Sequence, residues 1–198
     1  MRSLVLAVST AAVAAAVTAS SAPDVNDRAR LVKEFEERAA IYSQLSRKAA
    51  ATLPPLPDKA TPEQIAEHQK ALAKAIQAGR AGAFQGEILF DGVVPVFLDL
   101  LRSDLTGPKG KDARETIKDG DPRTDKGPNT GEPKPKEVQL VPNAPYPQGA
   151  ALSTVPPDLL AKLPKLPKPL EYRFVGGHLI LHDTEASLVV DYLKEVVA

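Results

Sequence analysis

The 198-residue sequence contains no cysteine and no tryptophan, and only 5% of its residues are aromatic. Without cysteine, the chain has no disulfide to stabilise a small core, no thiolate metal site and no lipobox for lipid attachment. A twin-arginine export signal is also absent. Because aromatic residues are few and much of the hydrophobic fraction is alanine, we expect a hydrophobic core of modest size.

An excess of charge of one sign is also lacking, since 25 basic residues balance 25 acidic ones. Removal of residues 1–19 takes away Arg2 and leaves 24 basic against 25 acidic residues, a net charge of −1. A near-neutral chain has no broad positive field to capture nucleic acid or anionic lipid. We therefore expect no nucleic-acid partner, and membrane contact only through an N-terminal segment that is not removed.

The N-terminus lacks a hydrophobic run long enough to cross a bilayer. Its apolar run, residues 4–17, contains no charge and no proline and has 14 members, whereas a spanning helix needs about 20. That length fits the core of a secretory signal peptide, and the small residues of Val17–Ala19 suit cleavage after Ala19. The sequence predicts a signal peptide over residues 1–19 and a periplasmic or secreted mature protein. The alternative is an uncleaved N-terminal anchor.

Residues 20–103 form a region that is predicted to be helical. A first helix is indicated by apolar residues at steps of three or four: Leu31, Phe35, Ala39, Tyr42, Leu45 and Ala49. Thr61–Gln64 forms a capping box with proline at the first helical position, and the second helix then presents Ile65, Leu72, Ile76 and Ala83. The apolar segment 91–105 accommodates Pro95 only within a first turn. We expect it to be the central helix of a small bundle.

The middle of the chain is dominated by proline, since 13 of the 19 prolines fall between Pro108 and Pro169. Residues 104–150 are predicted to be a largely irregular linker. They are rich in lysine, aspartate, glycine and proline, so they bury too little apolar surface to offset the entropy of ordering. A short helix over residues 111–118 and a short strand over residues 138–141 are the two elements that the linker allows.

Residues 151–198 are predicted to be ordered again. Ser153–Thr154 are expected to cap a short helix that begins near Asp158. The arm, residues 163–170, alternates leucine and proline in an extended conformation. We expect Leu163, Leu166 and Leu170 to pack it on its own domain, with docking to an aromatic groove of a partner as the alternative. Residues 172–175 and 178–182 flank Gly176–Gly177, which predicts a β-hairpin. The last segment, residues 185–197, is interpreted as a helix, with a third strand as the alternative.

The predicted fold is therefore α+β. It has an N-terminal helical hairpin or three-helix unit, a proline-rich linker, and a C-terminal β-hairpin with short flanking helices. Because neither ordered part alone buries much surface, we expect the two to pack together.

Three histidines and a few carboxylates are the candidates for chemistry. His178 and His182 on one strand lie about 13 Å apart, too far to share a metal, and are expected to be solvated on the polar face of the hairpin. Asp183 is expected to cap the following turn. No serine elbow, phosphate loop or calcium loop occurs. The sequence therefore predicts no catalytic residue, no metal ligand and no cofactor.

The hairpin carries the residues that we predict for binding: Tyr172, Arg173, His178, His182 and Asp183. The predicted function is that of a non-enzymatic envelope protein that binds another envelope protein or a cell-wall component. The alternative is a small periplasmic hydrolase that uses Asp183, Asp191 or His182. Under that alternative, Asp183→Asn abolishes turnover without changing the melting temperature.

The C-terminal segment resembles a known sequence pattern. The residues that carry it are Pro156–Pro167, with the letters PPDLLAKLPKLP, and Leu170–Gly176, with the letters LEYRFVG. They resemble a pattern of uncharacterised secreted bacterial proteins, and the resemblance covers about residues 61–195. It implies a signal peptide, a helical first half and a proline-leucine arm before a hairpin. It implies no activity, so no catalytic or binding residue is transferred from it.

Overall fold

The computed structural model describes residues 25–119, 138–147, 150 and 152–197. Within them the chain forms five helices and a five-stranded antiparallel sheet, which confirms the α+β class. The helices are α1 (Val25–Ala50), α2 (Pro62–Gly79), α3 (Val94–Thr106), α4 (Gly110–Asp119) and α5 (Pro157–Leu160). The strands are β1 (Ala144–Pro145), β2 (Ser153–Thr154), β3 (Leu170–Val175), β4 (His178–Asp183) and β5 (Leu188–Leu193), in the spatial order β1-β5-β4-β3-β2.

The first three helices form where local sequence signals predict them. Phe35, Ala39 and Tyr42 of the first apolar stripe are buried in α1. Both bonds of the capping box are present at the start of α2, where Thr61 Oγ1 accepts from Gln64 N at 3.3 Å. Pro95 stands in the first turn of α3, where its missing N–H costs no helical hydrogen bond.

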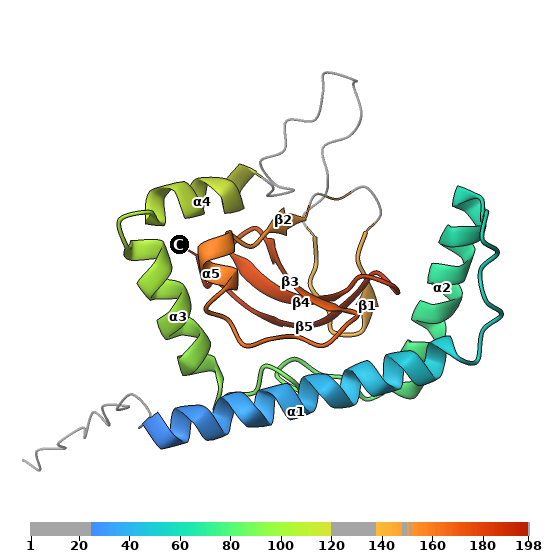
Figure 1. The fold of residues 1–198 in the computed structure, drawn as a ribbon, viewed down its shortest axis with the longest axis horizontal. Coiled ribbons are helices and arrows are strands. Elements are labelled where there is room, and N and C mark those ends of the chain that lie inside the picture. The colour runs from blue at the N-terminus through green and yellow to red at the C-terminus, as the bar shows by residue number, and fades with distance from the viewer. Residues whose placement is uncertain (1–24, 120–137, 148–149, 151, 198) are drawn as a thin grey trace, which may run out of the picture.

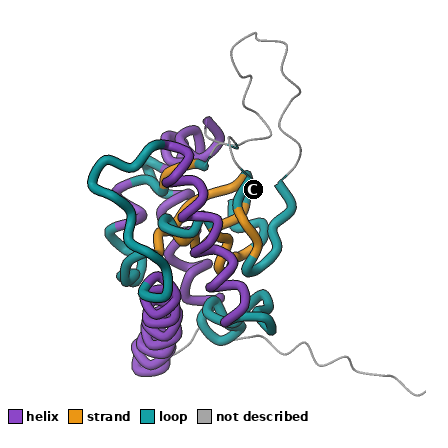
Figure 2. The backbone as a smooth tube through the Cα atoms, turned by 90° about the vertical axis from the view of Figure 1, so that its right-hand side faces the viewer, coloured by secondary structure: helices purple, strands orange, loops and turns teal. Residues whose placement is uncertain are grey.

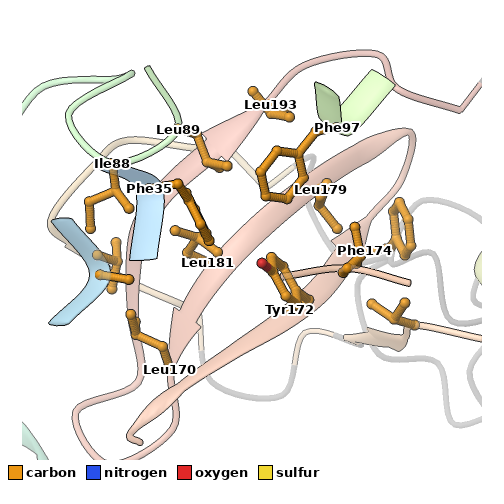
Figure 3. Close-up of a cluster of buried hydrophobic side chains, with 14 of the residues drawn as sticks. Phe35, Ile88, Leu89, Phe97, Leu170, Tyr172, Phe174, Leu179, Leu181 and Leu193 are labelled. Carbon is orange, nitrogen blue, oxygen red and sulfur yellow. The ribbon is translucent and has the colours of Figure 1, made fainter. Parts of the chain in front are cut away.

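The main core lies between one face of the sheet and the helices α1 and α3 (Figure 1). Phe35 of α1 and Phe97 of α3 meet edge to face, with ring centroids 5.0 Å apart, and Phe97 also contacts the Tyr172 ring of β3 at 6.1 Å (Figure 3). Helices and loops surround the strands (Figure 2). In the described part of the chain, no helix combines the length and hydropathy needed to cross a membrane.

The hairpin of β3 and β4 forms as predicted, and its two glycines have different roles. Gly176 has a φ of +58°, which a residue with a side chain rarely adopts. Gly177 lies under the C-terminal segment, because a Cβ there would stand 2.7 Å from the Val197 carbonyl oxygen. The turn therefore fixes the register of the hairpin and also anchors the chain after β5.

The predicted helix over residues 185–197 is wrong, because residues 188–193 form β5 on the free edge of β4. A continuous apolar run does not distinguish a short buried strand from a helix, and pairing with β4 satisfies the backbone groups of both strands. A bulge between β4 and β5 places Val190 and Asp191 opposite a single partner position. This bulge turns the Asp191 carboxylate toward the core side of the sheet, where it binds backbone N–H groups of the loop before α3.

Of three smaller predictions, the structure confirms one and contradicts two. The helix allowed at residues 111–118 is confirmed by α4. The strand allowed at residues 138–141 is wrong, since the strand of this segment is β1. Ser153–Thr154 form β2 rather than a helix cap, because α5 begins after Pro156 with no side-chain cap. Residues 1–19 and 120–137 lie outside the described residues.

Candidate functional site

A groove lies between α5, the arm and the edge of β3. Its volume is about 590 Å³. Its lining residues are Thr154, Val155, Leu160, Leu163, Pro164, Lys165, Leu166, Leu170, Glu171, Tyr172 and Arg173. We call it the arm groove. Most of these side chains are apolar and only three carry a charge, which is the usual composition of a site that binds by shape.

The arm forms one wall of the groove because its leucines are anchored in the core. Leu163 and Leu170 are buried, and Leu166 packs against the core cluster. The Tyr172 hydroxyl donates to the Pro164 carbonyl oxygen at 2.9 Å and so fixes the arm to β3. Burial raises the pKa of the Tyr172 phenol far above its ordinary value, so this hydroxyl remains a donor at any physiological pH. The sequence-based interpretation of the arm as packed on its own domain is confirmed.

The groove lies where the sheet narrows. β2 pairs only with Arg173 and Phe174 of β3, and Val155, Pro156 and Pro157 follow it. Proline has no N–H to donate and cannot continue a ladder. As a result, residues 170–172 of β3 have no strand partner on that side, and the arm groove occupies this edge.

Two of the three charged residues of the groove form an ion pair, and the third does not. Glu171 and Arg173 form an ion pair with each other, with Arg173 Nη2 and Glu171 Oε2 2.5 Å apart. Lys165 is exposed and has no ion-pair partner among the described residues. The arm groove therefore carries one uncompensated positive charge at its rim.

The five predicted binding residues do not come together. Tyr172 and Arg173 line the arm groove. His178 lies at the Gly-Gly turn, where its Nδ1 accepts from the Glu195 backbone N–H at 3.0 Å. His182 lies on the other face of the sheet against Tyr146, and Asp183 lies inside the core.

The expected solvation of both histidines is wrong for His182, whose exposed fraction is 7%. The hairpin has no solvent-facing side at this position, because residues 138–147 cover it. The sequence gives no local signal for this, since the covering segment lies more than 30 residues away along the chain.

Asp183 and Asp191 are both fully buried, and both carboxylates are occupied by structural hydrogen bonds. Asp183 accepts from the Tyr42 and Ser46 hydroxyls at 2.7 and 3.2 Å, and from the N–H groups of Glu185 and Ala186 at 2.9 and 2.8 Å. The turn-capping role predicted for Asp183 is therefore present. Burial and four accepted bonds leave no lone pair directed at solvent, which weighs against the hydrolase alternative.

Asp191 holds the loop between α2 and α3. It accepts from the N–H groups of Gly86, Ile88 and Leu89 at 2.8 to 2.9 Å, and from its neighbour Tyr192. Among the described residues, no group of three or more histidines and carboxylates is placed to hold a metal ion. Each of the two aspartates therefore connects segments that are distant in the sequence.

Sequence reasoning missed the lining residues Leu160 and Lys165. The signal was present in the proline-leucine arm itself, which was interpreted as a packed segment without the groove that it creates. Whether a packed arm encloses space depends on where β2 ends relative to β3, which is a tertiary property.

Comparison of the chain with protein-family models, curated proteins and solved structures finds no match. The resemblance of the C-terminal segment to secreted bacterial proteins stays a prediction.

Proposed function

We propose that the protein is an exported, non-enzymatic envelope protein that binds an extended segment of a protein partner in the arm groove. The observation that carries the proposal is the groove itself, an apolar channel along an unpaired strand edge. Extended peptides are commonly recognised beside strand edges, where pockets for side chains supply specificity.

The chemistry of the groove specifies its occupant. The groove favours an apolar side chain, because Leu163 and Leu166 form its inner wall and Leu160 is 49% exposed. The uncompensated Lys165 at the rim favours a carboxylate next to it, since complementary charges steer and orient a partner. We therefore infer an extended segment that combines an apolar side chain with a flanking acidic residue.

Peptide display on the full mature chain tests this occupant. We expect enriched peptides to carry an apolar residue beside Asp or Glu, and Leu160→Glu to weaken their binding at least about fivefold, because truncating or charging a central contact costs more than about 1 kcal/mol. Binding is measured by fluorescence anisotropy with labelled peptides. Lys165→Glu is expected to weaken binding several-fold and to remove the preference for an acidic residue.

Ile41→Glu serves as the matched control, since Ile41 is 66% exposed on α1 and lies outside the groove lining. Equal binding by the wild type and Leu160→Glu would reject the arm groove as the binding site. Cosedimentation with purified cell wall, unaffected by either groove variant, would instead favour a cell-wall component as the partner.

Export is tested separately from binding. We expect protein recovered from the producing cell's envelope or medium to begin at Ser20, as measured by intact mass and N-terminal sequencing. This follows from the short apolar run and the small residues before the predicted cleavage point. An intact Met1 on protein recovered from the cytosol would contradict the proposed location.

A further inference from the structure

His182 lies in a second, smaller cluster on the face of the sheet opposite the main core. The buried members of this cluster are Tyr146, Val175, Ile180, Val189 and Tyr192. Residues 138–147, which we call the strap, run across this face and contribute Tyr146, with Val138 and Leu140 partly buried. The ring of Tyr146 meets the imidazole of His182 edge to face, at 5.9 Å between centroids. The strap therefore shields this histidine from water.

The imidazole of His182 is buried without hydrogen bonds. Neither Nδ1 nor Nε2 has a partner among the described residues, and both atoms are inaccessible to solvent. A buried polar group without a partner is costly, and a buried charge is costlier still. Burial is the largest influence on the pKa of His182 and lowers it below the ordinary value of about 6.5.

The charged groups around His182 do not offset this burial. On β3, Glu171 stands directly across from His182, but its carboxylate pairs with Arg173. The positive charge of Arg173 opposes protonation of the imidazole. On β4 itself, the carboxylate of Asp183 is occupied by its four structural bonds. The strap brings the uncharged Tyr146, and β5 brings Val189.

Asn143 and Tyr146 flank the short strand β1 within the strap and are attached differently. Asn143 donates its N–H to the Val189 carbonyl at 2.7 Å. Asn143 also exchanges hydrogen bonds with α2, accepting from Gln77 Nε2 at 2.9 Å and donating to the Arg80 carbonyl at 3.0 Å. On the other side of β1, the Tyr146 N–H donates to the Ser187 carbonyl at 2.7 Å, and the tyrosine ring covers His182.

We propose that His182 is an acid-sensitive contact: its protonation releases Tyr146 of the strap from the sheet, while Asn143 stays bound to α2. An imidazolium needs solvent or an acceptor, and lifting Tyr146 gives it access to water. Release of Tyr146 exposes the apolar face formed by Val175, Ile180 and Val189.

The direction of the pH effect follows from linkage. The closed strap holds His182 with a pKa below that of the open state, so the open state binds more protons below about pH 6.5. The stability of the closed strap is therefore fully present above about pH 6.5 and is lost as pH falls below it. For one histidine with an ordinary open-state pKa, the largest loss between pH 7.5 and 5.5 is about tenfold in the closing equilibrium.

Amide hydrogen exchange followed by NMR on the full mature chain tests the proposal. After correction for intrinsic exchange rates, we expect protection of the Tyr146 amide to fall by up to about tenfold from pH 7.5 to 5.5. Protection of the Asn143 amide is expected to change less than about twofold. His182→Leu is expected to abolish the pH dependence at Tyr146, whereas His178→Gln and His68→Gln are expected to retain it.

Unchanged protection of Tyr146 in the wild type at pH 5.5 would overturn the proposal, and so would the same loss of protection in His182→Leu. Titration of the His182 side chain in the wild type gives a measurement that does not depend on a folded variant. A measured pKa at or above about 6.5 would also overturn it.

Discussion

Replacing Asp183 by alanine is expected to lower the free energy of unfolding by about 3 to 5 kcal/mol. The variant leaves two hydroxyls and two backbone N–H groups buried without their acceptor, and each such loss costs about 1 to 3 kcal/mol. The hydroxyls belong to Tyr42 and Ser46 on α1, and the N–H groups to the turn between β4 and β5. The carboxylate therefore joins the longest helix to the sheet. Urea denaturation measures the change.

Two variants calibrate this expectation. Tyr42→Phe removes the hydroxyl that donates to Asp183 and leaves the other three donors in place. We therefore expect the free energy of unfolding to fall by about 1 kcal/mol. Asp158→Ala removes an exposed carboxylate that pairs with Lys109 at 2.9 Å, and we expect no measurable change in the free energy of unfolding. If Asp183→Ala or Asp183→Asn kept full stability but lost a hydrolytic activity, the hydrolase alternative would be favoured over the binding function proposed above.

Asp191→Ala is expected to destabilise the protein to a similar extent, by about 3 to 5 kcal/mol, for a different structural reason. All four of its donors are backbone N–H groups, and three of them belong to the loop residues Gly86, Ile88 and Leu89. Ile88 and Leu89 are themselves buried in the main core, so releasing the loop also loosens the contact between α3 and the sheet. Thermal and urea denaturation measure the loss.

The loop provides a local readout that separates the two aspartates. Limited proteolysis is expected to cut residues 82–90 faster in Asp191→Ala than in Asp183→Ala at equal global stability, because only Asp191 holds this loop. Asp99→Ala, which removes a half-exposed partner of Arg28, is the control and is expected to leave cleavage unchanged. Equal cleavage rates in the two buried variants would contradict the role assigned to Asp191.

Local signals account for the parts of the fold that were predicted correctly. The stripe of α1, the capping box of α2 and the first-turn proline of α3 act within one or two helical turns. Gly176 favours the hairpin turn in the same way, because its positive φ is a property of the local backbone, whereas Gly177 also makes room for the distant Val197 carbonyl. The predicted packing of the arm follows from leucines that alternate with prolines over eight residues.

The errors occur where a distant segment decides the structure. The apolar run of β5 is compatible with a helix by itself, and the open edge of β4 selects a strand. β1 and β2 are two residues each, too short to give a periodic pattern. The arm groove exists because β2 stops at consecutive prolines while β3 continues, a relation between two segments that no local pattern contains.

The sequence by itself determined the α+β class, the helices of the first half and the hairpin turn, since each depends on backbone preferences and short-range hydrogen bonds. The tertiary structure alone decided that the carboxylates of Asp183 and Asp191 join distant segments, and that His182 is buried beneath the strap. Burial is a property of what packs against a residue. For these three side chains, the packing segments come from parts of the chain between 35 and 141 residues away.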